Sequence, residues 1–107
     1  MVKDIDAKTL KSWLDKDTDL YIIDARDPKD YKKDHLPGAI SLMLSDIGPD
    51  SIKRFSKEKI TIVYSNDENC PASGLVSKKL DDLGFKEVYD YNPSYADWRS
   101  KGYPLES

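Results

Sequence analysis

The segment Ile60–Tyr64 constrains the fold of this 107-residue chain more than any other segment does. It is a continuous run, rich in β-branched side chains and without a charged residue, which predicts a strand that is buried on both faces. Strands of this kind belong to parallel sheets whose two faces are covered by helices. The segment therefore favours an α/β fold.

Short apolar runs alternate with helical stretches along the rest of the chain, and this order also predicts an α/β fold with a mainly parallel sheet. Further strands are expected at residues 2–5, 20–23, 39–42 and 88–91. Helices are expected from the cap Asp6 to about residue 14, after the cap Asp27, from about residue 50, from 71 to the stop signal Gly84, and from 92–94 onwards.

The length of the chain predicts one domain, residues 1–107, with one modest core. Charged residues make up 35% of the sequence with both signs interspersed, and the net charge of −3 argues against nucleic acid or an anionic membrane as a partner. No apolar run approaches the roughly 18 residues of a membrane span, and the first residues lack the apolar stretch of a signal peptide. We therefore expect a cytoplasmic protein.

Cys70 is the only cysteine of the chain, and His35 is the only histidine. One cysteine cannot form an internal disulfide, so the sequence gives no sign of an oxidising compartment. His35 has no partners at the spacing of metal ligands, so we expect no metal ion. No cofactor is expected either.

Cys70 lies in the loop that connects the predicted strand to the following helix. It follows a polar loop and directly precedes Pro71, a residue favoured at the first position of a helix. We therefore expect Cys70 to cap this helix, with its sulfur accepting a hydrogen bond from the amide of Ala72 or Ser73. Free amides and the helix dipole at such a position favour the thiolate, which predicts a nucleophile.

Two observations support the opposite interpretation. Asp67 and Glu68 lie in the same loop, and carboxylates raise the pKa of a neighbouring thiol and repel an anionic sulfur donor. Free cysteines are also often packed in a structure without a chemical role. The sequence therefore leaves open whether Cys70 is reactive or only a small, partly buried loop residue.

Other residues near this junction have structural interpretations. Ser65 would need a general base to act as a nucleophile, so we expect it to form hydrogen bonds within the loop. Asp24 and Arg26 follow a buried strand and are expected to form an ion pair, although Arg26 is also the best candidate for a cation beside the pocket. His35 is expected to anchor its turn through a hydrogen bond. A cysteine phosphatase is disfavoured because Val76 stands at the position of its phosphate-clamping arginine.

Three groups of residues together resemble a rhodanese-like domain over nearly the whole chain. They are residues 22–27 with Tyr31 and the segment 35–40, then 62–64 with 80–85, and finally 88–89 with 97–98 and 102–106. The resemblance implies a parallel sheet of about five strands with helices on both faces. It also implies sulfur transfer, in which a loop cysteine takes a sulfane sulfur, holds it as a persulfide and passes it to an acceptor.

The chain departs from the family pattern at the loop itself. The family cysteine directly after the strand is replaced by Ser65, and the loop up to Ser73 is longer by about two residues and has no arginine or lysine. Pro93 and Ser94 replace a pair of glycines before the last helix. The chain resembles a long-loop subset with two cysteines, of which the first is replaced here by Ser65.

Two hypotheses follow for the function. In the first, the protein is a sulfurtransferase in which Cys70 forms a persulfide and passes sulfur from a sulfane-sulfur donor to a thiol acceptor, which a protein could supply. The acidic loop argues against thiosulfate and for a persulfide donor. In the second, the protein is a catalytically inactive binding or regulatory domain. The expected substrate-binding residues, with the loop amides of 66–73, are Ser65, Asn66, Asn69, Ala72, Ser73 and Arg26.

Overall fold

The computed structural model describes all residues from 1 to 107 and contains five strands, four α-helices and one short 3-10 helix. The strands are β1 (Val2–Asp4), β2 (Leu20–Asp24), β3 (Ile40–Ser41), β4 (Ile60–Tyr64) and β5 (Val88–Asp90). The helices are α1 (Ala7–Asp15), α2 (Pro28–Lys33), α3 (Ala72–Asp82) and α4 (Ser94–Ser100), with the 3-10 helix η1 at Leu44–Asp46. No helix combines the length and the apolar character that a membrane crossing requires.

All five strands form one parallel sheet in the order β1-β5-β4-β2-β3. The strand β4 lies at its centre and pairs with β2 along its whole length, from Leu20 opposite Ile60 to Asp24 opposite Tyr64. Parallel neighbours require crossover connections, which the helices provide. The predicted five-stranded parallel sheet is confirmed, and the predicted strand at 60–64 has the observed bounds.

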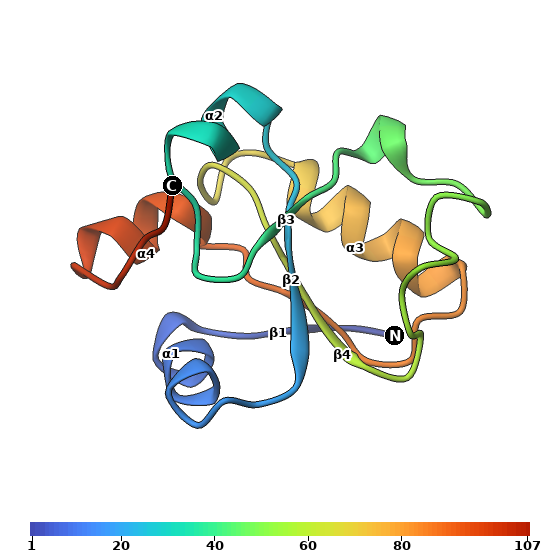
Figure 1. The fold of residues 1–107 in the computed structure, drawn as a ribbon, viewed down its shortest axis with the longest axis horizontal. Helices are drawn as coiled ribbons and strands as arrows, with labels where there is room; N and C mark the ends of the chain where they lie inside the picture. The colour runs from blue at the N-terminus through green and yellow to red at the C-terminus, as the bar shows by residue number, and fades with distance from the viewer.

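Helices cover both faces of the sheet, as expected. Adjacent residues of a strand point to opposite faces, so Ile62 and Val63 enter two different apolar clusters. Val63 packs with Val76 and Leu80 of α3, whereas Ile62 joins the cluster that holds residues of α1 and α4. In Figure 1, α1 and α4 accordingly lie to the left of the strands and α3 lies to the right.

The predicted helix boundaries follow from local hydrogen bonds. The Asp6 carboxylate accepts a hydrogen bond from the Thr9 amide over 2.8 Å and so caps α1. The Asp27 carboxylate accepts one from the Lys29 amide over 2.9 Å and caps α2. Gly84 follows α3 with a φ of +98°, a left-handed conformation that glycine adopts without strain. These three signals were readable from the sequence and are confirmed.

The helix expected from about residue 50 is wrong. Residues 49–54 form consecutive turns instead, held by bonds such as that from the Phe55 amide to the Ile52 carbonyl over 3.0 Å. The Ser51 hydroxyl binds both the amide and the carbonyl of Gly48, at 2.9 and 3.1 Å. Such side-chain bonds compete with helical ones, so the segment stays irregular while Ile52 and Phe55 anchor it in the core.

Candidate active site

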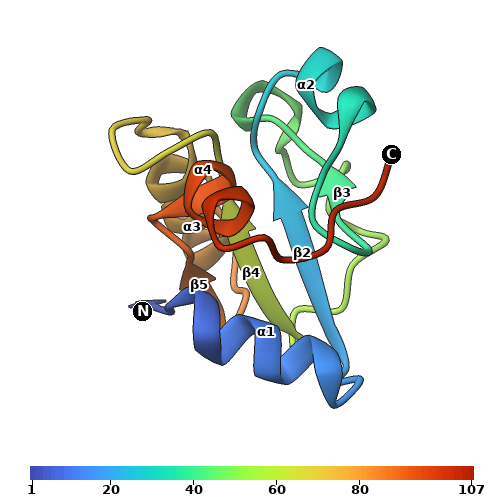
Figure 2. The same ribbon diagram turned by 90° about the vertical axis from the view of Figure 1, so that its left-hand side faces the viewer.

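The loop of residues 65–71 joins the carboxyl end of β4 to α3 and carries Cys70. Because Tyr64 lies opposite Asp24 in the parallel sheet, the chain leaving β2 emerges beside this loop at the same edge. In open α/β sheets the carboxyl edge is where ligand sites form. Figure 2 shows the loop rising beside α4, at the end of β4.

Hydrogen bonds to Asp67 and to α4 hold the loop in place. The Asp67 carboxylate accepts hydrogen bonds from the amides of Asn69 and Cys70, at 3.0 and 3.1 Å. The carbonyls of Ser65 and Asn66 accept hydrogen bonds from the first amides of α4, over 3.1 and 2.9 Å. The position of Cys70 is therefore set both by its own loop and by α4.

Ser65 is fully buried at the start of the loop. Its amide donates a hydrogen bond to the Ser94 hydroxyl over 3.0 Å, which in turn donates to the Tyr91 carbonyl over 3.0 Å. Ser94 has a φ of +64°, a conformation that costs a residue with a Cβ about 1–2 kcal/mol. The Ser94 hydroxyl thus forms two hydrogen bonds that a glycine at this position could not form. The Ser65 backbone is therefore bonded to α4 rather than within the loop, and its hydroxyl forms no close hydrogen bond.

The pKa of the Cys70 thiol is lowered. The largest cause is a hydrogen bond from the Ala72 amide to the sulfur, and partial burial acts against it. The Ser65 hydroxyl and the Asn66 amide also favour the thiolate, whereas the charge of Asp67 disfavours it with a smaller effect. The carboxylate expected to suppress the thiolate is therefore outweighed by amides and a hydroxyl.

One detail of the predicted helix start is wrong. Cys70 is not the cap, because Pro71 adopts helical angles and its carbonyl accepts the first helical hydrogen bond, from the Leu75 amide over 3.1 Å. The helix α3 therefore begins at Ala72, and its cap is Pro71. The Ala72 amide, which was expected to favour the thiolate, is nevertheless the largest cause of the lowered Cys70 pKa.

The side chain of Ser73, one of the predicted site residues, lies away from the groove. The Ser73 side chain is fully buried and lies by the Asp90 carboxylate, whose pKa it lowers while burial raises it more strongly. Neither the Ser73 hydroxyl nor one Asp90 oxygen forms a close hydrogen bond. Asn69 is exposed, and its amide is bonded to Asp67. The contribution of Ser73 to a site at Cys70 is thus limited to its backbone amide.

Arg26 forms the expected ion pair with Asp24, and both side chains are almost completely buried. Its guanidinium donates to the Asp24 carboxylate at 2.9–3.2 Å and to the Asp34 carbonyl at 2.6 Å. The Tyr64 hydroxyl donates to the same carboxylate over 2.5 Å, and the Tyr95 ring lies 4.2 Å from the guanidinium. Arg26 thus supports the end of β2 and does not line the hollow that contains Cys70.

His35 anchors its turn as expected. Its Nδ1 lies 2.8 Å from the Tyr31 carbonyl, and the two rings stack with centroids 3.9 Å apart. Its backbone also pairs with Glu106 near the end of the chain. The histidine therefore has a structural part in this fold.

An apolar groove of about 430 Å³ opens beside the thiol. Sequence reasoning missed this groove and its two exposed leucines, Leu44 of η1 and Leu75 of α3. A signal was present, because Leu75 falls outside the buried face of α3 that the helical pattern predicted. The groove is lined by Ala25, Met43, Leu44, Ser45, Cys70, Pro71, Ala72 and Leu75.

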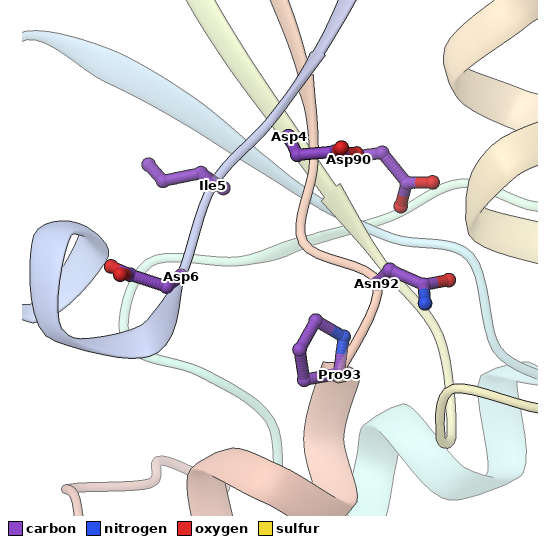
Figure 3. Close-up of a pocket in the computed structure, with 6 residues that line it drawn as sticks. All are labelled: Asp4, Ile5, Asp6, Asp90, Asn92 and Pro93. Carbon is purple, nitrogen blue, oxygen red and sulfur yellow. The ribbon is translucent and has the colours of Figure 1, made fainter.

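A second hollow, of about 650 Å³, lies at the ends of β1 and β5, away from the thiol. Figure 3 shows Asp4 beside Asp90 on the two neighbouring strands, with Asp6 where β1 leads into α1. The carboxylates form no cluster that could hold a metal ion. This hollow is larger than the groove but contains no nucleophile, so the groove with Cys70 is the candidate active site.

Comparison with known proteins yields one consistent family. The family model described as "Rhodanese-like domain" matches residues 6–101. The thiosulfate sulfurtransferase GlpE of Coxiella burnetii is 33% identical over 92 residues, which cover 85% of this chain and 83% of GlpE. YrkF of Bacillus subtilis, whose name proposes a sulfur-carrier role, is 26% identical over 94% of this chain. This chain spans only about half of YrkF, 52% of its length.

Solved structures give the same result. The BH2092 protein of Bacillus halodurans superposes with a TM-score of 0.93 and 30% identity, over 98% of this chain and 77% of that one. The rhodanese-like domain of the Alr3790 protein from Anabaena superposes with a TM-score of 0.87 and 26% identity, over all of this chain and 80% of that one.

Proposed function

The chain belongs to the rhodanese-like family, and on that premise we propose that it transfers sulfane sulfur through a persulfide on Cys70. The observation that carries the proposal is the place of Cys70 in a groove at the start of α3, where the Ala72 amide is the largest cause of the lowered thiol pKa. A thiolate is the reactive form of cysteine, and a low pKa raises its fraction near neutral pH. The sulfurtransferase name of the relative GlpE supports this chemistry.

The proposed reaction has two displacement steps. The Cys70 thiolate attacks the outer sulfur of a donor persulfide, the donor S–S bond breaks, and the donor leaves as a thiolate. The acceptor thiolate then attacks the outer sulfur of the Cys70 persulfide, and Cys70 leaves as a thiolate. The sulfur atom carries its proton through both steps, so atoms and charge balance. One S–S bond is exchanged for another in each step, without an external oxidant.

The surrounding groups have distinct parts in this proposal. The amides of Asn66 and Ala72 and the Ser65 hydroxyl stabilise negative charge on the sulfur of Cys70. The Ser73 amide lies in the first turn of α3, where no intrahelical carbonyl is available to it, so it is available as a donor for a terminal sulfur. Asn69 and Arg26 contribute indirectly, by holding the loop and the end of β2 in place.

The test is loading followed by cyanolysis. Wild-type protein and the Cys70→Ala variant are incubated with thiosulfate or with glutathione persulfide and separated from unreacted donor by gel filtration, and thiocyanate is measured after cyanide is added. We expect thiocyanate from the wild type alone, with glutathione persulfide as the better donor because Asp67 and Glu68 repel thiosulfate. The proposal fails if the wild type yields no more thiocyanate than the variant with either donor.

The second candidate is a catalytically inactive binding or regulatory domain. It is favoured by Ser65 at the usual position of the family nucleophile and by Arg26, whose guanidinium is held by Asp24. The alkylation rate of Cys70 as a function of pH separates the two candidates. A midpoint at or above the ordinary thiol value of about 8.5 would favour the inactive domain, and a lower midpoint favours the enzyme.

A further inference from the structure

We propose that the groove beside Cys70 docks an acceptor protein through a segment that carries an apolar residue on one side of the accepting cysteine and a basic residue on the other. This inference rests on the proposed function, because it names the partner of the same thiol. Cys70 itself lines the groove, so a thiol that approaches its sulfur from this side meets an apolar surface.

The exposed side chains of the groove supply the first argument. Only three large hydrophobic residues are exposed in the chain, namely Met1, Leu44 and Leu75. Two of them flank this groove, with 37% of Leu44 and 49% of Leu75 exposed. Single exposed apolar residues are common, but two that gather around a nucleophile indicate a contact surface. This contact surface fits an apolar side chain of the partner.

The charges around the loop supply the second argument. On the side of α4, Asp67 and Glu68 line a smaller hollow of about 280 Å³ together with Asp97, which is itself paired with Lys101, so the negative charge there comes from Asp67 and Glu68. The nearby cation of Arg26 is already paired with Asp24. The loop therefore presents negative charge on one side of Cys70 and apolar surface on the other. A small anionic thiol matches neither side, whereas a segment with an apolar and a basic residue around its cysteine matches both.

The third argument comes from Ser65. Its hydroxyl is fully buried and lies near enough to the Cys70 sulfur to favour the thiolate, yet it forms no close hydrogen bond. Buried hydroxyls are normally satisfied, so an open donor beside a thiol indicates a polar group still to be received there. A sulfur atom added to Cys70 supplies such a group. The site is thus prepared to hold the persulfide while the partner segment binds across the loop.

The experiment uses the full chain with Cys70 loaded from glutathione persulfide, and it measures single-turnover transfer to short peptides. One peptide has two leucines before its cysteine and a lysine after it, and a second has glutamates in those positions. Dithiothreitol serves as the reference acceptor. Because burial of one leucine favours binding by more than a factor of ten, we expect about a tenfold faster transfer to the first peptide.

Matched variants identify the surface. Leu75→Gln is expected to lower the ratio of the peptide rate to the dithiothreitol rate several-fold, because it removes an apolar contact in the groove. Lys79→Gln changes an exposed residue of the same helix outside the groove and is expected to leave the ratio unchanged. Glu68→Gln is expected to reduce the ratio of the transfer rates to the lysine peptide and the glutamate peptide. It is also expected to make this ratio less sensitive to salt concentration.

Each other outcome overturns the inference. Equal rates for the two peptides, or an unchanged ratio in Leu75→Gln, would overturn protein docking while the loading of Cys70 leaves the proposed function intact. Benzyl mercaptan that accepts sulfur as fast as the leucine peptide would show a small apolar thiol as the occupant instead. A stable dimer in sedimentation that loses its stability in Leu75→Gln would assign the groove to a second copy of the chain. No loading of Cys70 at all would overturn both proposals.

Discussion

The hydroxyl of Ser94 accepts a hydrogen bond from the amide of Ser65 over 3.0 Å and so joins the first residue of α4 to the first residue of the thiol loop. The same hydroxyl donates to the Tyr91 carbonyl, which fixes its direction. The resemblance to the family had marked this position only as the loss of a glycine. In the structure the Ser94 side chain holds the loop at the end of β4 by a hydrogen bond that a glycine could not form.

Ser94 therefore offers a test of strain against hydrogen bonding. Ser94→Ala loses both hydrogen bonds and keeps a Cβ in the left-handed region, so we expect it to lower the free energy of unfolding by about 2 kcal/mol. Ser94→Gly loses the same bonds but relieves strain of about 1 kcal/mol, so it should be the more stable of the two variants. Urea unfolding measures both, and the reverse order would contradict the account.

The Ser65 side chain should lower the pKa of the Cys70 thiol. Its hydroxyl lowers the pKa of Cys70, so Ser65→Ala is expected to raise that pKa and to slow alkylation by iodoacetamide at pH 7. Ser77→Ala is the matched control, since Ser77 is equally buried and its hydroxyl also lacks a close partner, but it lies further along α3. A rate that falls equally in both variants would show a general loosening of the fold rather than an effect on the sulfur.

The ion pair of Asp24 and Arg26 should contribute strongly to stability, because it is buried. Arg26→Ala leaves the Asp24 carboxylate buried without its cation, for which we expect a loss of about 3–5 kcal/mol. Lys53→Ala breaks the exposed pair with Asp50 and should cost less than about 1 kcal/mol. Thermal and urea unfolding of the two variants provide the comparison, and similar losses would refute it.

Asp90 should make stability depend on pH in the opposite direction from an ordinary paired aspartate. Burial raises its pKa in the folded state, so the stabilising contribution of the neutral carboxyl is present below the unfolded pKa of about 3.9 and is lost as the pH rises through the folded pKa. Asp90→Asn is therefore expected to gain stability over the wild type at pH 7 and to show no gain at pH 3. Unfolding curves at the two pH values test this, and a constant difference would contradict it.

Much of the fold was predictable because its signals are local. The strand at 60–64, the cap Asp6 and the stop at Gly84 each depend on a few adjacent residues. The absent helix at 50 shows the limit of such signals, because the Ser51 side chain and two buried anchors decided the conformation there. A helical window of residues does not reveal how one hydroxyl will bond to the backbone.

The candidate site was predictable only in part, since it depends on segments that are distant in the sequence. The contact between Cys70 and the Ala72 amide is local and was expected. The groove needs Leu44 and Leu75 from two different elements, and no pattern within either element brings them together. Similarly, the packing of α3 against β5 brings the side chain of Ser73 close to Asp90, which the sequence alone did not indicate.

The sheet order also has a consequence for synthesis of the chain. The first strand β1 pairs only with β5, which is the last of the five strands in sequence order. The carbonyls of Ser65 and Asn66 accept hydrogen bonds from the amides of Tyr95 and Ala96, which are synthesised after β5. Cys70 is therefore synthesised before the residues that hold its loop, and the thiol acquires these surroundings only after residue 96 has been made.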